Sequence, residues 1–352
     1  MGGRMLRAGL DATRSETCEA SDPIWRVSSG SAAVLGLCTL AMDVAPTTAY
    51  LMLGDRCQRA CAFCAQARDS QASADALSRV VWPPFAAGKV AEAVARAFRE
   101  ERIARACFQV TVHPGYIERA LTAVAMLRSL SPMPICVSIA ARSIEDVSAL
   151  LKAGAERVTL ALDAATPMLY HAVKGADWER VWKLLACAAD VFPGRIGTHL
   201  IAGLGESERE MAERMQTLYD LGVTIGLFAL TPVRGSAWEN RQPPELISYR
   251  RVQAAHWLIV QGVARAEQMA YGLDGRIVDL GIAEDTLRIL LGDGTAFRTA
   301  GCPGCNRPYY NERPGGPLYN HPCTLTSDKA RAELDTLLAT LCGDNSHHPE
   351  TG

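Results

Sequence analysis

The sequence carries almost no net charge and has no long apolar run. Its 36 Lys and Arg against 38 Asp and Glu leave a formal charge of −2 over 352 residues, whereas nucleic-acid binders usually have a basic excess. Its most apolar window, residues 32–45, is broken by Thr39 and Asp43, and a membrane-spanning helix needs about 20 apolar residues. Residues 1–20 are rich in charge and lack the apolar segment of a secretion signal. We therefore expect a cytoplasmic protein with neither nucleic acid nor membrane as a partner.

The composition excludes disorder for most of the chain, because 49% of the residues are hydrophobic and 21% are charged. The number of cysteines, 12, is high for such a protein. A chain of this size does not need a disulfide framework, and cytoplasmic thiols stay reduced. Clustered cysteines are therefore expected to be metal ligands or catalysts.

From about residue 85 onward, amphipathic helices alternate with short apolar strands. Repeated strand–helix units build a parallel sheet, and no G-x-G-x-x-G motif follows the first strand to favour an open dinucleotide-binding sheet. We predict an α/β fold of the TIM type, a (βα)8 barrel over residues 46–300, with an N-terminal extension (1–45) and a C-terminal segment (301–352). The predicted strands are 49–53, 107–112, 135–139, 158–162, 196–201 and 223–230.

Three cysteines follow the first predicted strand, at the end of a barrel where active sites lie: Cys57, Cys61 and Cys64. Their thiolates can surround one small inorganic centre. A fourth ligand would complete a tetrahedral zinc site, whereas three ligands leave a [4Fe-4S] cluster with one iron free to chelate a small molecule. The alternative is a zinc site that takes its fourth ligand from elsewhere in the chain.

The motif Cys57-x3-Cys61-x-Phe63-Cys64 after a first barrel strand resembles the signature of the radical S-adenosylmethionine (SAM) enzymes. The resemblance implies that the open iron binds the amino and carboxylate groups of SAM, and that the backbone at Phe63 approaches the adenine. It also implies reductive cleavage of SAM to a 5′-deoxyadenosyl radical, which takes hydrogen from an unactivated carbon. No catalytic residue beyond the cluster can be identified, and radical chemistry does not require a general acid or base.

Three later segments resemble the biotin synthase branch of these enzymes: residues 158–166, 197–207 and 230–236. Asp163 matches one residue of that branch's ribose clamp, but Ala161 stands where the clamp has an asparagine. Residues 197–207 are equally an ordinary strand, glycine turn and helix cap, and a histidine such as His199 can simply be packed. The resemblance implies SAM binding by Phe63, Ser138, Asp163, His199, Ile201 and Thr231.

Biotin synthase holds a second cluster on cysteines of its barrel strands. Cys136 falls at a matching place and Cys107 close to one, but Gly197 stands at a third. Because that ligand is missing, we do not expect the biotin synthase cluster. We interpret Cys107, Cys136 and Cys187 as small buried apolar residues.

A Cys-Pro-Gly-Cys turn, Cys302 to Cys305, begins the C-terminal segment. Its bend holds two thiolates close together, as metal-binding knuckles do. We predict an auxiliary [4Fe-4S] cluster on Cys302, Cys305 and a third cysteine, either Cys323 or Cys18. The alternatives are a structural zinc ion and a redox-active cysteine pair.

The tail CPGCNRPYYNERPGG, together with residues 77–83, resembles the biotin-synthase-like chains of the two-chain lipoyl synthases. The resemblance implies sulfur insertion into an octanoyl group on a lysine of a lipoyl-carrier protein, with sulfur from the auxiliary cluster. It also implies a paralogous radical SAM partner chain and a reductant such as ferredoxin or flavodoxin. The polar tail could instead be a solvated group of ion pairs around Arg307, Glu312 and Arg313.

Two other functions remain open at this point. A methylornithine-synthase-like mutase or a hydrogenase-maturation-like enzyme would share the barrel and the radical chemistry without sulfur transfer. A non-enzymatic iron–sulfur or zinc scaffold would hold the metal without cleaving SAM.

Overall fold

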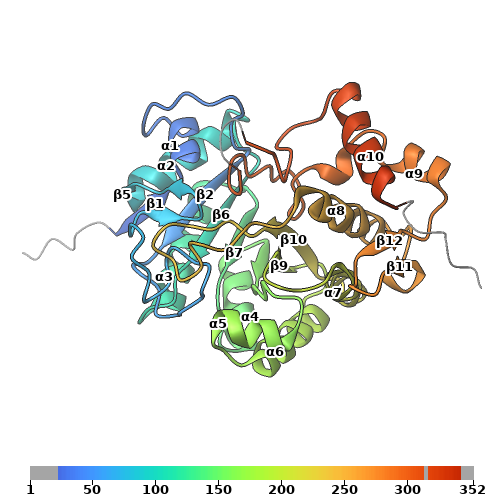
Figure 1. Cartoon of the computed structure of the whole chain (residues 1–352). Helices are drawn as coiled ribbons and strands as arrows, with labels where there is room; N and C mark the ends of the chain where they lie inside the picture. The colour runs from blue at the N-terminus through green and yellow to red at the C-terminus, as the bar shows by residue number, and fades with distance from the viewer. Residues whose placement is uncertain (1–22, 313–315, 342–352) are drawn as a thin grey trace, which may run out of the picture.

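The computed structural model describes residues 23–312 and 316–341, which form one eight-stranded sheet with helices packed along it (Figure 1). The strand order across the sheet is β10-β9-β8-β7-β6-β2-β1-β5. Cys18, Arg313 and Cys342 lie outside the described residues.

Six neighbouring strands of this sheet are parallel, and their order across the sheet follows their order along the chain. They are β2 (Thr48–Leu53), β6 (Arg105–Val110), β7 (Ile135–Ser138), β8 (Arg157–Thr159), β9 (Ile196–Ala202) and β10 (Thr224–Ala229). Their carboxyl ends therefore meet at one end of the sheet. These strands match the six predicted ones, and the α/β, TIM-like class is confirmed.

The other two strands of the sheet are not βα repeats. β1 (Ile24–Val27) pairs antiparallel with β2, and β5 (Pro84–Ala86) pairs antiparallel with β1. Within the described ranges, no ladder joins β10 to β5. The predicted count of eight βα units is therefore corrected to six. The reason is that, among the described residues after β10, the strands form a separate hairpin, β11 (Ala270–Tyr271) and β12 (Ile277–Asp279), instead of two more strands of the sheet.

Local capping chemistry sets several helix ends. Ser207 and Glu210 form a reciprocal capping box at the start of α7, and Thr166 caps α5 with a proline in the first turn. Gly154 ends α4 with a φ of 116°, which favours glycine. The helices are α1 (Ser29–Val34), α2 (Ala87–Arg99), α3 (Tyr116–Leu130), α4 (Ile144–Ala153), α5 (Pro167–Lys174), α6 (Trp178–Val191), α7 (Glu208–Asp220), α8 (Leu246–Val260), α9 (Glu284–Leu291) and α10 (Ser327–Leu341).

The two faces of the sheet have different environments. Leu51 and Leu53 of β2 belong to the main hydrophobic core with the helices, whereas Tyr50 and Met52 belong to a separate small cluster that includes Cys107. Successive strand residues point to opposite faces. The inner face is therefore the one that can carry polar side chains and thiols.

The C-terminal segment crosses back to the amino-terminal ends of β2 and β6. Asn306 accepts a hydrogen bond from the Thr47 amide at 3.0 Å and donates one to the Ala45 carbonyl at 2.9 Å, and Arg105 donates to the Pro303 carbonyl at 2.8 Å. In Figure 1 this red-brown segment lies beside the blue and cyan part of the chain. Cys302 and Cys305 are therefore carried to the inner side of the sheet at that end.

A buried arginine joins α8 to α10. Arg250, 1% exposed, pairs with Glu333 at 2.7 Å and donates to the Leu318 and Tyr319 carbonyls at 2.6 Å. Removing one partner of a buried pair leaves an unpaired charge, which costs about 3–5 kcal/mol. We expect Arg250→Met to lower the free energy of unfolding by about that amount in chemical denaturation.

The control for this prediction is Arg288→Met in α9. Arg288 also pairs with a residue of α10, Asp335, but its side chain is 44% exposed, and exposed pairs contribute little. The variant should keep the wild-type denaturation midpoint. Equal losses in the two variants would contradict the assignment of a structural role to Arg250.

Among the residues that the structure describes, no helix is both long enough and apolar enough to cross a membrane.

Candidate functional site

The first cysteine group, Cys57, Cys61 and Cys64, lies on the loop that leaves the carboxyl end of β2. The Cys57 sulfur accepts hydrogen bonds from the Arg59 amide at 3.4 Å and the Val112 amide at 3.3 Å. The Cys64 amide donates to the Cys61 carbonyl at 3.0 Å, which closes a tight turn. Amide donors to sulfur stabilise a thiolate. The loop therefore combines a tight turn between two of its cysteines with amide donors to the sulfur of the third, as expected for ligands of a metal centre.

Three backbone hydrogen bonds anchor this loop to different parts of the fold. The Gln58 amide donates to the Val112 carbonyl at 2.7 Å, and the Ala62 amide donates to the Val173 carbonyl at 2.8 Å. The Ala62 carbonyl in turn accepts from the Trp238 amide at 3.1 Å. Because β6, α5 and the segment after β10 all hold the loop, its cysteines have defined positions.

Gly54 begins the loop with a φ of 97°, and a Cβ there would lie 2.4 Å from side-chain atoms of both His113 and Thr111. We expect Gly54→Ala to destabilise the protein by about 1–3 kcal/mol through overpacking and backbone strain, and to lower the iron bound by the first cysteine group. Thermal unfolding and iron analysis measure the two effects.

Gly36→Ala is the matched control, because Gly36 has a φ of 72° and a Cβ added there would meet nothing within 4 Å. It carries the backbone strain without the collision. A Gly54→Ala protein that resembles Gly36→Ala in both stability and iron content would contradict the prediction.

The thiols of the first group lie in an apolar environment. Burial raises the pKa of Cys64 to about 12, and burial also raises the pKa of Cys61, which Lys174 opposes. A positive iron centre would keep these groups ionised. In the described ranges no three Cys, His, Asp or Glu side chains surround a point as ligands of a single metal ion.

A buried ion pair lies behind the first cysteine group. Lys174 donates to Asp163 and to the Ala161 carbonyl, both at 2.6 Å, and the two charged side chains are 8% and 11% exposed. Asp163 and Cys61 both raise the pKa of Lys174 against the effect of burial. Lys174 and Cys61 line a side cavity of about 160 Å³.

The central cavity, about 210 Å³, is lined by every residue that the resemblance assigned to SAM binding. These are Phe63, Ser138, Asp163, His199, Ile201 and Thr231, and Cys64 lies with them. The remaining wall is largely apolar, with Leu77, Phe228, Leu230 and Tyr310. The cavity joins the carboxyl ends of the strands to the first cysteine group.

His199 lies on the inner face of β9 in contact with Phe228, with ring centroids 5.0 Å apart. Burial lowers its pKa to about 4. The imidazole is therefore neutral at physiological pH and can act as a hydrogen-bonding group without carrying charge.

The second cysteine group consists of Cys107, Cys136, Cys302 and Cys305, which line a lower cavity of about 50 Å³ between the amino-terminal halves of the strands. The sulfurs of Cys136 and Cys302 are 3.4 Å apart. Their hydrogen bond lowers the pKa of Cys302 to about 6, with Arg105 and Arg157 also lowering it. Gln109, His199, Phe228 and Tyr310 line both this cavity and the central one.

This arrangement differs from the sequence-based expectation at several cysteines. Cys323 is exposed and does not line the lower cavity, while Cys107 and Cys136 do. Cys187 is also exposed, so it is not a buried packing residue. The physical reason is the return of the C-terminal segment, which places Cys302 and Cys305 against inward-facing residues of β6 and β7.

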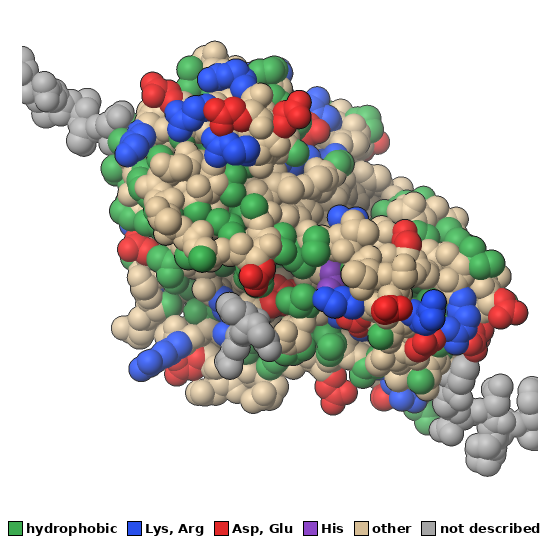
Figure 2. Space-filling model, turned by 90° about the horizontal axis from the view of Figure 1, so that it is seen from above, with side chains coloured by type: hydrophobic (Ala, Val, Ile, Leu, Met, Phe, Trp, Pro, Cys, Tyr) green, Lys and Arg blue, Asp and Glu red, His purple; other side chains and the backbone are tan. Residues whose placement is uncertain are grey.

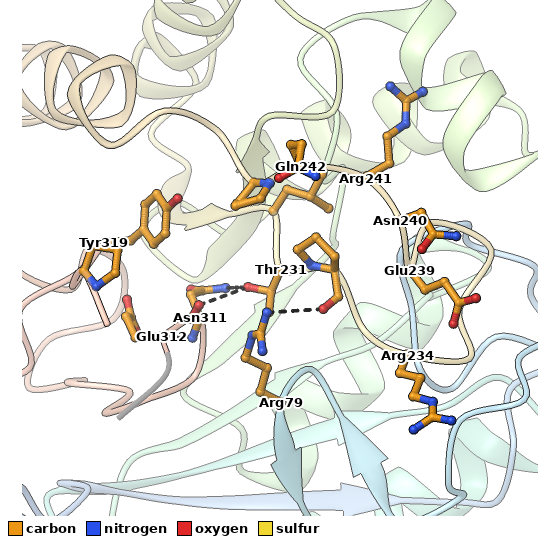
Figure 3. A pocket seen from close by; sticks show the side chains of 14 residues that line it. Arg79, Thr231, Arg234, Glu239, Asn240, Arg241, Gln242, Asn311, Glu312 and Tyr319 are labelled. Atoms are coloured by element: carbon orange, nitrogen blue, oxygen red, sulfur yellow. Dashed lines mark hydrogen bonds between the residues drawn. The ribbon is translucent and has the colours of Figure 1, made fainter. Parts of the chain in front are cut away.

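A wide vestibule of about 820 Å³ opens beside the central cavity and shares Leu230, Thr231 and Asn311 with it. Figure 3 shows Asn311 hydrogen-bonded to Thr231 at its inner wall, at 2.9 Å, with Arg234 and Glu239 farther out. On the face drawn in Figure 2, basic and acidic side chains are intermingled. The wall of the vestibule likewise carries both signs, with Arg79, Arg234 and Arg241 beside Glu239 and Glu312.

Residues 51–218 match the Radical SAM superfamily. This match covers a little under half of the chain. No curated protein sequence matches the chain. A solved structure of HydG, a maturase of the [FeFe]-hydrogenase, is similar with a TM-score of 0.50 and 15% identity, over 62% of this chain and 51% of that one. The chain thus spans about half the length of that relative, and the likeness shows the fold.

Two further solved structures are similar at lower scores. HydG from Carboxydothermus hydrogenoformans has a TM-score of 0.46 and 20% identity, over 61% of this chain and 52% of that one. Methylornithine synthase, PylB, has a TM-score of 0.47 and 12% identity, over 61% of this chain and 62% of that one.

A radical SAM domain implies a [4Fe-4S] cluster and SAM, and the residues present fit both. The loop supplies three thiols with amide donors on Cys57, and the adjoining central cavity offers Asp163 as a carboxylate and an apolar wall at Ile201. When bound, SAM supplies a 5′-deoxyadenosyl group for hydrogen abstraction. Cys57, Cys61 and Cys64 would hold the cluster.

Sequence reasoning did not single out Lys174 or Tyr50. Lys174 is the last residue of α5 and belongs to none of the sequence motifs. Only its burial beside Asp163 in the structure identifies it as part of the site. Tyr50 lies on β2 and donates or accepts a hydrogen bond with Cys305 at 3.1 Å. Its position on the inner face follows from strand alternation, but its partner lies 255 residues away in the chain.

Proposed function

We propose that this radical SAM enzyme inserts sulfur into an aliphatic carbon–hydrogen bond. The observation that supports the proposal is the position of two separate cysteine groups on either side of one apolar cavity. Cys64 lines the central cavity, and Tyr310 forms a wall between that cavity and Cys305. A carbon placed in this cavity would have a hydrogen-abstracting cofactor on one side and a source of sulfide on the other.

The chemistry balances with a one-electron donor of the ferredoxin or flavodoxin class. One electron cleaves SAM to methionine and the 5′-deoxyadenosyl radical, which takes a hydrogen atom from the substrate to give 5′-deoxyadenosine. The substrate carbon then forms a bond to a sulfide of an auxiliary iron–sulfur cluster, whose iron accepts the surplus electron. The cluster is consumed as the source of sulfur.

The substrate proposed here is an octanoyl group on a lysine of a lipoyl-carrier protein. A saturated chain suits a wall made of Leu77, Phe228 and Leu230, because it buries apolar surface without leaving polar groups unpaired. The vestibule shares Leu230, Thr231 and Asn311 with the central cavity, so it is the side from which a substrate attached to a protein would approach. A paralogous radical SAM chain is proposed as the partner, because the C-terminal tail resembles chains of the two-chain lipoyl synthases.

Other radical SAM reactions fit the barrel equally, including those of mutases like methylornithine synthase and of hydrogenase maturases. Mass spectrometry of an octanoyl-lysine peptide, incubated anaerobically with this protein, SAM and a strong reductant, separates them. We expect a sulfur adduct together with 5′-deoxyadenosine.

Two results would contradict the proposal. If 5′-deoxyadenosine forms but the peptide is unchanged even with the paralogous chain present, the reaction is another radical one. If neither appears in protein reconstituted with iron, the chain is a metal scaffold.

A further inference from the structure

The second cysteine group has the composition of a closed metal site. Two of its thiols come from neighbouring strands, Cys107 of β6 and Cys136 of β7, which are directly paired in the sheet. The other two come from the turn Cys302–Cys305, and all four line the same cavity. The first cysteine group has three thiols, so the two groups differ in ligand number.

The turn that carries Cys302 and Cys305 is built to hold both thiols on one side. The Cys305 amide donates to the Cys302 carbonyl at 3.1 Å, and Gly304 has a φ of 74°. Thr47 donates through its hydroxyl to the Gly304 carbonyl at 2.5 Å. The turn is therefore fixed to the residue that precedes β2.

Individual donors are directed at the sulfurs. Gln109 donates to Cys107 at 3.1 Å, and Arg105 donates to Cys136 at 2.9 Å. Tyr50 is hydrogen-bonded to Cys305 at 3.1 Å. Hydrogen bonds to thiolate sulfur are the usual outer shell of iron–sulfur clusters and tune their potentials. Ordinary packing cysteines do not need such donors.

Positive charge surrounds the lower cavity. The Nε and Nη1 atoms of Arg157 and the Nε atom of Arg105 are buried with no hydrogen-bond partner, and Arg157 and Arg307 line the cavity. A buried donor without an acceptor costs about 1–3 kcal/mol, and more for a charged group. An anionic group in the cavity would pair with the Arg157 atoms and offset that cost, whereas Arg105, which donates to Cys136, is also paired with Glu156.

We propose that Cys107, Cys136, Cys302 and Cys305 bind an iron–sulfur cluster through four thiolates, with Arg105 and Arg157 as its countercharges. All of its irons would have protein ligands, which distinguishes it from the SAM-binding cluster. Its role as sulfur donor rests on the proposed function, whereas the site itself does not. In this proposal Cys107 and Cys136 take the place of the predicted ligand Cys323.

The test uses the full-length chain with Cys57, Cys61 and Cys64 all replaced by Ala, so that only the second site is counted. After anaerobic reconstitution we expect about four irons and four sulfides per chain, with the absorption and electron paramagnetic resonance of a cubane. Adding Cys107→Ser and Cys136→Ser should remove most of that iron. Adding Cys323→Ser, or Cys38→Ser with Cys187→Ser at exposed positions, should remove none.

The variant Arg157→Met keeps all four thiols, so it tests the role of the positive charge separately from any loss of folding that the cysteine replacements cause. It should change the reduction potential or the cluster content while metal-free unfolding stays like that of the parent. Iron lost with Cys323→Ser and kept with Cys107→Ser and Cys136→Ser would overturn the proposal, as would a single zinc ion or no metal in the parent.

The outcomes separate this site from the proposed function. A four-iron site without any sulfur adduct on the octanoyl peptide would leave the site standing and remove its role. A sulfur adduct formed at the wild-type rate by protein with intact Cys57, Cys61 and Cys64 but lacking Cys107 and Cys136 would remove the site's role as sulfur donor and leave the sulfur-insertion reaction standing, while the site itself stands or falls on the iron content of the variants.

Discussion

Replacing Cys61 by Ala is expected to abolish the reductive cleavage of SAM. The loop offers three thiols, and a cubane that keeps one iron open for SAM needs all three. Cys61 cannot be replaced by a neighbour, because the described part of the chain places no other cysteine on this loop besides Cys57 and Cys64. The measurement is 5′-deoxyadenosine formed under strong reductant, together with iron per chain. We expect the product to vanish and about four irons to be lost.

The control for Cys61→Ala is Cys187→Ser. Cys187 lies exposed on α6 and lines none of the cavities described here. Its replacement should leave both the product and the iron content at wild-type levels, and both proteins should show the same metal-free thermal unfolding. Continued formation of 5′-deoxyadenosine by Cys61→Ala would show that the cluster is not held by this loop.

The parallel strands were predictable because each carries its signal locally. A short apolar run between glycine or proline breaks identifies β7 or β10 without knowledge of its neighbours. The antiparallel strands β1 and β5 have no such signal. β5 is only three residues long, and its pairing depends on β1, which precedes it by about sixty residues in the chain. Sequence periodicity therefore predicts the six parallel strands but not the two antiparallel strands, β1 and β5, at the edge of the sheet.

The same distinction applies to the cysteines. Cys57, Cys61 and Cys64 lie within one loop, so their spacing alone identifies them. The contact between Cys136 and Cys302 joins residues 166 positions apart, and it depends on strand register and on the path of the C-terminal segment. A strand cysteine that faces the interior looks like an apolar filler until its neighbours are known.

The ion pair between Lys174 and Asp163 carries the second large prediction. Both side chains are nearly nine-tenths buried or more, and α5 brings Lys174 to within 2.6 Å of Asp163. Asp163 has a φ of 67°, an uncommon backbone conformation for a residue other than glycine, and its amide donates to the His199 carbonyl at 2.8 Å. The pair therefore holds the carboxylate at the wall of the central cavity.

Lys174→Met is expected to lower the free energy of unfolding by about 3–5 kcal/mol, because it leaves the Asp163 carboxylate buried without a partner. The matched control is Lys152→Met on the exposed side of α4, which should be neutral. The double variant Asp163→Asn with Lys174→Met removes both charges and should recover much of the loss, since no unpaired ion remains. Chemical denaturation of the metal-free proteins gives all the values.

The double variant also separates stability from cofactor binding. If Asp163 contacts the ribose of SAM, the recovered protein should still bind SAM more weakly than wild type in calorimetry after cluster reconstitution. The electrostatic role of Lys174 has a different signature, because loss of a cation beside Cys61 should move the cluster's reduction potential to a more negative value. Stability and potential that both match those of Lys152→Met would show that the ion pair supports neither the fold nor the cluster.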